Sequence, residues 1–131
     1  MILNAHPLTG VNDVKFGMKR IEVRSIWGEC TEFMKTPDSL SPTDDFGFCH
    51  VYYDEEDSCE GIEIFCEAEV YLDGTKIFPI PAEELIKNFP DFSEDDDGPY
   101  CIGMSVSIWA PEGEPESIMF AREGYCDFLE C

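Results

Sequence analysis

The stretch FGFCHVYYDEEDSCEGIEIFC, residues 46–66, decides the fold class. Its first part, 46–53, and its last part, 61–66, are rich in the aromatic and β-branched residues that favour strands. The acidic segment 54–58 between them is a turn, because it is short and polar and separates two apolar runs. The stretch therefore predicts an antiparallel hairpin.

Two more hairpins follow from similar patterns. Residues 69–72 and 75–78 flank Asp73-Gly74, a two-residue turn signal because both positions tolerate positive φ. Near the end of the chain, residues 104–110 pair with 116–122 across a turn that contains two prolines and a glycine.

Two short helices complete the predicted elements. The first spans roughly 18–27, places Val23 and Ile26 on its core face and ends at Gly28. The second begins at Pro81 and ends before Pro90, and its core positions follow the spacing i, i+3, i+4, i+7: Ala82, Leu85, Ile86 and Phe89. The remaining stretches 35–45 and 91–98, rich in Pro, Ser and Asp or in acids, are predicted to be connections.

These elements predict a single α+β domain over residues 1–131. It contains an antiparallel sheet of about five or six strands and two short helices. Two short helices can cover only one face of the sheet. The other face is therefore either solvated or a surface that binds a partner. A shift of 56 residues places Glu56 on Glu112, Glu60 on Glu116 and Ile62 on Ile118. This echo is consistent with a diverged α-β-β duplication.

Charge is the dominant chemical property of the chain. The formal net charge is −21, yet 44% of residues are hydrophobic and 13% aromatic, so the chain folds around a core. Residues 1–36 hold five basic and four acidic side chains, whereas 37–131 hold three basic and 25 acidic ones. Such a surface repels nucleic acid and anionic membranes and attracts basic proteins.

Cysteine and histidine usage argues against a metal site. The seven cysteines form no Cys-x-x-Cys pair, and only His6 and His50 could complete a zinc site, so no metal and no cofactor is expected. Adjacent Cys49 and His50 project from opposite faces of their strand and cannot act together as nucleophile and base. No secretory signal or membrane-spanning run is present, and free thiols suit a reducing compartment, so a cytoplasmic location is expected.

The segment 16–28, FGMKRIEVRSIWG, resembles the Gly-Met-x-x-x-Glu-Val-x-x-Ile-x-Gly entry of BamE and β-lactamase-inhibitor-protein domains. In that superfamily, short helices pack on an antiparallel sheet and the protein works by binding other proteins. Lys19 departs from the hydroxyl residue that the family has at the helix start. The positions that carry the resemblance are Gly17, Met18, Glu22, Val23, Ile26 and Gly28.

In general character the chain is similar to the immunity proteins of bacterial polymorphic-toxin systems, which are small, acidic and non-catalytic. That similarity implies a basic partner, either a toxin domain or another nucleic-acid-binding protein, and no direct contact with nucleic acid or membrane. Acidic clusters with aromatic anchors are typical of such an interface. The expected partner-binding residues are Asp54, Glu55, Glu56, Asp57, Glu94, Asp95, Asp96, Asp97, Tyr52, Tyr53 and Trp109.

Two other classes stay open. A phage-type nucleic-acid mimic would also be strongly acidic. A small divalent-cation binder or an enzyme is the third class, but no catalytic motif is present and no catalytic residue is assigned. An EF-hand placed with Gly98 at loop position 6 has Met104 where the bidentate glutamate must stand.

Overall fold

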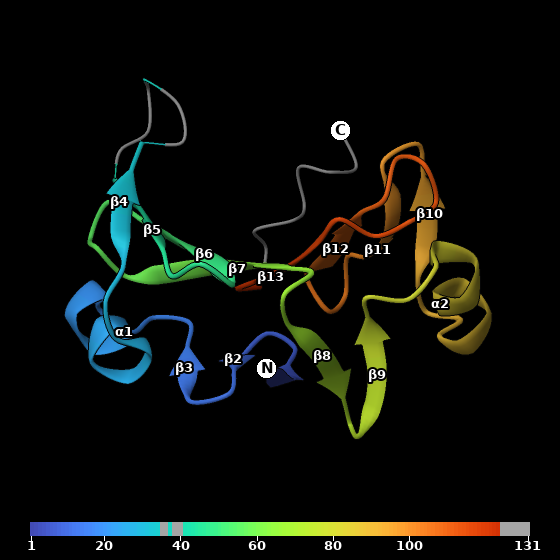
Figure 1. Cartoon of the computed structure of the whole chain (residues 1–131), viewed down its shortest axis with the longest axis horizontal. Helices are drawn as coiled ribbons and strands as arrows, with labels where there is room; N and C mark the ends of the chain where they lie inside the picture. Colours follow the sequence, from blue (N-terminus) through green and yellow to red (C-terminus); the bar gives the residue numbers. More distant parts are fainter. Residues whose placement is uncertain (35–36, 38–40, 124–131) are drawn as a thin grey trace.

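The computed structural model describes residues 1–34, 37 and 41–123, which form two sheets and two helices (Figure 1). The smaller sheet is mixed, with β1 parallel to β8, and its strand order is β3 (Val14–Lys15), β2 (Gly10–Val11), β1 (Ile2–His6), β8 (Glu69–Leu72) and β9 (Thr75–Phe78). Neither helix is long and apolar enough to cross a membrane.

The larger sheet is antiparallel throughout. It has eight strands, so the prediction of five or six was wrong. Their order is β10 (Ser93–Asp95), β11 (Gly98–Cys101), β12 (Val106–Trp109), β13 (Ser117–Ala121), β7 (Cys59–Phe65), β6 (Cys49–Tyr53), β5 (Thr43–Asp45) and β4 (Thr31–Phe33).

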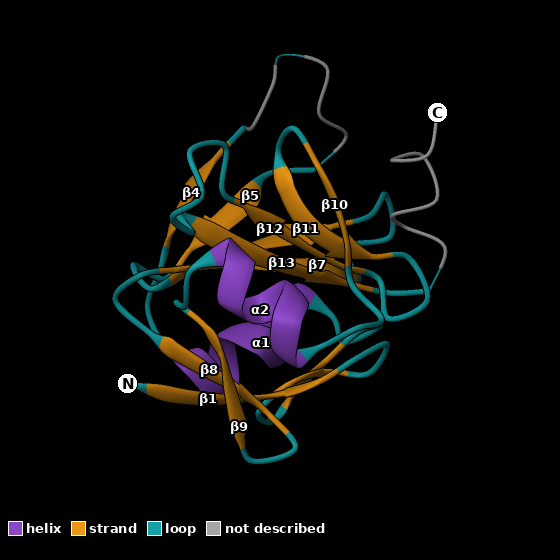
Figure 2. Ribbon diagram, turned by 90° about the vertical axis from the view of Figure 1, so that its right-hand side faces the viewer, coloured by secondary structure: helices purple, strands orange, loops and turns teal. Residues whose placement is uncertain are grey.

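Both helices lie on one face of the eight-stranded sheet. Figure 2 shows α1 (Arg20–Trp27) and α2 (Ala82–Asn88) between this sheet and the five-stranded sheet. Alternation along β7 sends Ile62 and Ile64, both fully buried, into this layer, and Glu63 to the opposite face. We call that opposite side the open face, because neither helix covers it.

The helices differ from the predicted ones in detail. The first begins at Arg20, where the Lys19 N–H donates to the Glu22 carboxylate, and it ends at Gly28, whose φ is 90°. Val23 is buried as predicted, whereas Ile26 is 39% exposed and therefore not a core residue. In α2, Ala82 and Leu85 are buried and Ile86 and Phe89 pack against the core.

The element order α-β-β-β-β occurs twice in the chain. The first run is α1-β4-β5-β6-β7 and the second is α2-β10-β11-β12-β13. The runs meet where β7 pairs with β13, and Figure 1 shows α1 and β4 at one side of this centre and α2 and β10 at the other. We call the two runs the first half and the second half.

The register at the junction is symmetric. Ile62 pairs with Phe120 and Ile64 with Ile118, on either side of the Glu63–Met119 pair. A shift of 56 residues exchanges these two pairs, as a local two-fold axis would. The halves also share a backbone contact: the Arg20 N–H donates to the Asp57 carbonyl, and the Ala82 N–H donates to the Gly113 carbonyl, at 3.0 Å each.

Two stretches predicted as connections contain strands. The stretch 35–45 includes β5, and its residues 35–36 and 38–40 lie outside the described part. The acidic stretch 91–98 forms most of the β10–β11 hairpin. Its turn depends on Gly98, which has a φ of 126° and lies so close to β12 that an added Cβ would be 2.4 Å from the Ile108 carbonyl oxygen.

We predict that Gly98→Ala lowers the free energy of unfolding by about 3 kcal/mol, because positive φ and a backbone clash act together. Gly113→Ala is the control, since φ there is 91° but the added Cβ meets open space. It should cost about 1 kcal/mol. Urea denaturation of both variants measures the difference, and equal losses would contradict the close approach of β11 to β12.

Candidate functional site

The two acidic clusters expected to bind a partner lie at opposite ends of the eight-stranded sheet. Asp54–Asp57 forms the β6–β7 turn, where β7 begins. Glu94–Asp97 covers the end of β10 and the β10–β11 turn, and strand directions place this turn at the other end, where β7 finishes. The two clusters therefore do not make one continuous patch.

The β6–β7 turn uses much of its charge internally. Asp54 accepts hydrogen bonds from the backbone N–H groups of Ser58 and Glu56, which hold its pKa below the ordinary range together with Arg122. Asp57, with a φ of 64°, accepts from Arg20 Nε at 2.8 Å. Of the four acids in this turn, only Glu55 and Glu56 are exposed carboxylates that make no such internal bond. Reversing all four charges would therefore alter the turn as well as the surface.

The opposite end gathers acids from three adjoining segments. The Ala82 N–H joins the start of α2 to the β12–β13 turn at Gly113, and the Ala110 N–H donates to the Asp97 carbonyl at 2.7 Å. All the carboxylates on these segments are exposed. We call this surface the acidic end: Glu83, Glu84, Glu94, Asp95, Asp96, Asp97, Glu112, Glu114 and Glu116.

Basic side chains do not neutralise the acidic end. Within the described residues, none of its nine carboxylates makes an ion pair. All three arginines are paired elsewhere: Arg20 and Arg24 with acids of the first half, and Arg122 with Asp54 and Glu60. The negative charge at this end therefore faces solvent.

The structure separates the three aromatic residues expected to anchor a partner. Tyr52 and Tyr53 are both buried, with 7% and 5% of their surface exposed, so neither ring is a surface anchor in this structure. The Tyr52 hydroxyl donates to Glu63 and the Tyr53 hydroxyl to Asp44. Trp109 is 47% exposed on the open face, and the Glu116 N–H donates to its carbonyl, so it adjoins the acidic end.

Tyr53 belongs to a buried ion cluster around Asp44. The carboxylate of Asp44 has no solvent exposure and accepts hydrogen bonds from Arg20, Arg24 and the Tyr53 hydroxyl. The guanidinium of Arg20 lies 4.0 Å from the centroid of the Tyr53 ring and also donates to Ser41 Oγ and the Pro42 carbonyl. The cluster ties α1 to β5, β6 and the segment before β5.

Burial alone would raise the pKa of Asp44. Hydrogen bonds from Arg24 and Tyr53 and the positive charges of Arg20 and Arg24 outweigh burial, and the pKa lies below its ordinary range. Asp44 therefore stays ionised as a permanent counterion for two arginines. Burial and the same carboxylate raise the pKa of the Tyr53 hydroxyl, which remains a hydrogen-bond donor.

The second half has no equivalent of this cluster among the residues that the structure describes. The shared backbone contact puts Ala82 in the place of Arg20, and Ile86 follows it as Arg24 follows Arg20. In the edge pairs, Glu32 pairs with Asp44 and Glu94 pairs with Pro99. The same arrangement of elements thus forms without the ions, and Glu94 is left without the arginine that Glu32 has.

Aromatic side chains cross the open face. The ring of His50 packs edge-on against Phe33, with centroids 4.9 Å apart, and against Phe65 at 4.6 Å. Further across the sheet, Ser117 pairs with both Phe65 and Trp109. We call Phe33, His50, Phe65 and Trp109 the aromatic row. It runs from edge strand β4 to β12, where it meets the acidic end.

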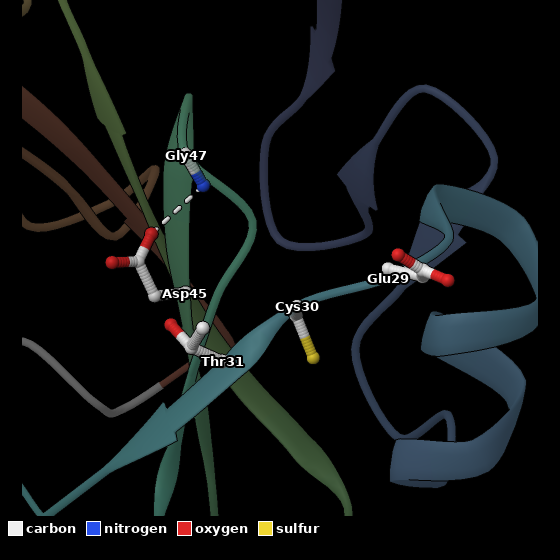
Figure 3. Close-up of a pocket in the computed structure, with 5 residues that line it drawn as sticks. All are labelled: Glu29, Cys30, Thr31, Asp45 and Gly47. Atoms are coloured by element: carbon white, nitrogen blue, oxygen red, sulfur yellow. Dashed lines mark hydrogen bonds between the residues drawn. The ribbon is translucent and has the colours of Figure 1, made fainter.

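Beside β4 lies a shallow pocket of about 350 Å³, lined by Glu29, Cys30, Thr31, Asp45 and Gly47. Figure 3 shows the Glu29 and Asp45 carboxylates on either side of Cys30, with the Gly47 N–H donating to Asp45. Two carboxylates at an open pocket suit a basic side chain. Burial raises the pKa of the Cys30 thiol, so it is a weak nucleophile at neutral pH.

The described residues contain no group of three or more His, Cys, Asp or Glu side chains arranged to hold a metal ion. The stretch around Gly98, which departs from the EF-hand pattern at Met104, forms the β10–β11 hairpin. Cys49 and His50 point to opposite faces as predicted, with Cys49 buried and His50 on the open face.

Reasoning from sequence missed the Asp44 cluster and the aromatic row, because both join residues far apart in the chain. Phe33 carried one available signal: an apolar residue in a polar stretch. The contribution of Glu83 and Glu84 to the acidic end was also missed, since they lie on α2 and not in an acidic turn.

We predict that Asp44→Asn lowers the free energy of unfolding by about 3 kcal/mol, because the buried Arg20 and the half-buried Arg24 lose the counterion that they share. Tyr53→Phe removes one hydrogen bond to the same carboxylate and keeps the ring, so it should cost about 1 kcal/mol. Urea denaturation at neutral pH compares the two. A loss below about 1 kcal/mol for Asp44→Asn would contradict a stabilising role for the cluster.

The contribution of Asp44 should depend on pH in one direction. Because its folded pKa is depressed, its stabilisation is complete above the unfolded value of about 4 and is lost as pH falls through the folded value. The difference in melting temperature between the wild type and Asp44→Asn should therefore be constant from about pH 7 to 5 and shrink below about pH 4. A difference that grows in acid would contradict the depressed pKa.

Comparisons with known proteins give no relative. No family model matches the chain, and the searches of curated proteins and of solved structures found no match. The resemblance of residues 16–28 to BamE and β-lactamase-inhibitor-protein domains therefore stays a prediction.

Proposed function

We propose that this protein is a non-catalytic inhibitor that binds and neutralises a basic protein, and that it serves as an immunity protein against a nuclease-like toxin. The acidic end carries the proposal, because nine exposed carboxylates from three segments lie together there without an ion pair among the described residues. Carboxylates that repel one another lower the stability of the folded state. A cluster of nine such groups at one end of the molecule therefore favours a role in recognition.

The arrangement of charge supports a protein partner. Clustered carboxylates at one end attract a basic cleft over a long range, which speeds encounter and disfavours acidic competitors. Nucleases are basic around the cleft that binds nucleic acid, so an acidic inhibitor is steered toward that cleft by the same field that attracts phosphates. The open face beside the acidic end supplies apolar area, from Phe65, Met119 and Trp109, that charge alone lacks.

The alternative of a nucleic-acid mimic predicts carboxylates spaced along a track like phosphates. The acidic end is instead a compact group on adjoining turns, and the β6–β7 turn at the far end of the sheet is partly neutralised by Arg20 and Arg122. This placement favours a single local contact over an extended charged track.

We further propose that the two halves are diverged copies of one α-β-β-β-β unit. The repeated element order, the exchanged register pairs around Glu63–Met119 and the matching backbone contacts at Arg20 and Ala82 support this proposal. On this account the halves have divided two tasks: the first keeps a buried ion cluster, and the second presents unpaired acids.

The function is tested by capture from a native host lysate, with washes at about 50 mM and then about 500 mM salt and identification by mass spectrometry. We expect one basic protein to be released as salt rises, because salt screens exposed charge pairs. The purified partner should lose its nuclease activity when one equivalent of this protein is added. A captured DNA-binding protein displaced by DNA would favour the mimic, and capture of no salt-sensitive protein would contradict both.

We predict that Glu94→Lys/Asp96→Lys slows association with that partner at least tenfold, because it reverses charge at the acidic end. Glu55→Lys/Glu56→Lys is the matched control: it makes the same change in net charge on exposed side chains at the opposite end. Stopped-flow association rates at about 50 mM salt compare them. Equal slowing by both pairs would show that net charge matters and its location does not.

A further inference from the structure

The open face has the composition of an interface core. Apart from Asp45 and Glu63, the carboxylates lie at its ends, and its strands present neutral or aromatic side chains such as Phe65, Met119 and Trp109. Both oxygens of the Glu63 carboxylate accept hydrogen bonds within the face, from the hydroxyls of Tyr52 and Ser117. A neutral, aromatic centre beside a charged end matches the core and rim of protein interfaces.

On the open face, Gly61 leaves room for the side chain of Met119. Gly61 lies under the Met119 side chain, where an added Cβ would be 2.5 Å from Met119 Cε and 3.6 Å from the Tyr52 ring. The Met119 side chain therefore packs along the sheet over Gly61, and a larger residue at position 61 would displace it. The described pocket beside the open face is shallow, which suits contact with another folded protein better than enclosure of a small ligand.

Trp109 joins the aromatic row to the acidic end. It occupies the place that Tyr52 has in the first half, because Tyr52 pairs with Gly61 as Trp109 pairs with Ser117. Tyr52 is buried, whereas Trp109 exposes 47% of its surface between Ser107 on the open face and the acids of the β12–β13 turn. Large, partly exposed aromatic residues in such positions carry much of the binding energy of interfaces.

We propose that the open face around Trp109, together with the acidic end, is the docking surface for a basic folded protein. The proposal rests on the proposed function and specifies the surface it uses. Lysine and arginine side chains of the partner would oppose Asp95–Asp97 and Glu112–Glu116, while an apolar patch covers Trp109 and Phe65. Charge selects this occupant over a second copy, since two chains of net charge −21 repel.

The test uses the full chain with Trp27→Phe, which leaves Trp109 as the sole tryptophan. The probe is pancreatic ribonuclease, a basic protein that contains no tryptophan, added at about 20 mM salt. We expect saturable binding with a change in Trp109 emission, and shifts of backbone amides in β12, β13 and the β10–β11 turn of the ¹⁵N-labelled chain.

Variants then locate the surface. Trp109→Ala and Asp96→Lys/Asp97→Lys should each weaken binding of the probe at least fivefold, as measured by calorimetry. Their controls are Ile21→Ala, at an exposed apolar residue of α1, and Glu55→Lys/Glu56→Lys, and both should stay within about twofold of the parent. Circular dichroism melts confirm that every variant is folded.

The outcomes separate the two proposals. Binding of the probe without a change at Trp109, or with amide shifts confined to the β6–β7 turn or the five-stranded sheet, overturns the docking surface and leaves the proposed function standing. Failure to bind any basic protein at low salt overturns the proposed function itself. A dimer of this chain that buries Trp109 in the absence of the probe also overturns the proposal.

Discussion

The pairing of β7 with β13 is the interaction on which the architecture depends. Without it the chain would form two four-stranded sheets, each with an unpaired central edge and half of a core. Pairing places Ile62, Ile64, Ile118 and Phe120 side by side beneath the sheet, and all four are almost completely buried. Because a one-residue slip would send these side chains to the open face, burial enforces the register. The opposite ends of the sheet, and therefore the position of every acidic turn, follow from that register.

Sequence patterns predicted the parts of the fold that carry regular apolar periodicity. The hairpin of β6 and β7, the hairpin of β12 and β13 and the helix α2 are of this kind, and so is the single helical layer. The outer strands were missed because β4, β5, β10 and β11 are short and rich in acids, proline or glycine. In β5 the buried residues are Thr43 and Asp44, both polar, so an apolar pattern cannot reveal this strand. The burial of Asp44 depends on Arg20 and Arg24, two helical residues about 20 positions earlier.

The sequence predicted that the candidate site is acidic, but it did not predict how the parts of the site are arranged. Local sequence shows that Asp54–Asp57 and Glu94–Asp97 are acidic turns, but only strand directions show that they lie at opposite ends. Alternation alone could not decide between Tyr52 and Tyr53, and both are buried: Tyr52 beside Glu63 on the open face and Tyr53 in the Asp44 cluster. Comparison of the two halves explains why the acids of the second half are unpaired, which the sequence of a single turn does not. Where the first half supplies Arg20 and Arg24, the second supplies Ala82 and Ile86, so its acids stay unpaired.

One feature shared by the halves bears on behaviour at high concentration. Among the described strands, β4 and β10 are the two outer edges of the large sheet, and each has a glutamate at its middle position, Glu32 and Glu94. An edge strand with unpaired backbone groups is a template for growth into fibres, and charge at its centre is a known deterrent. Any copy of this chain that approached edge to edge would bring glutamate against glutamate. Charge at both outer edges of the sheet therefore disfavours its growth by edge-to-edge pairing.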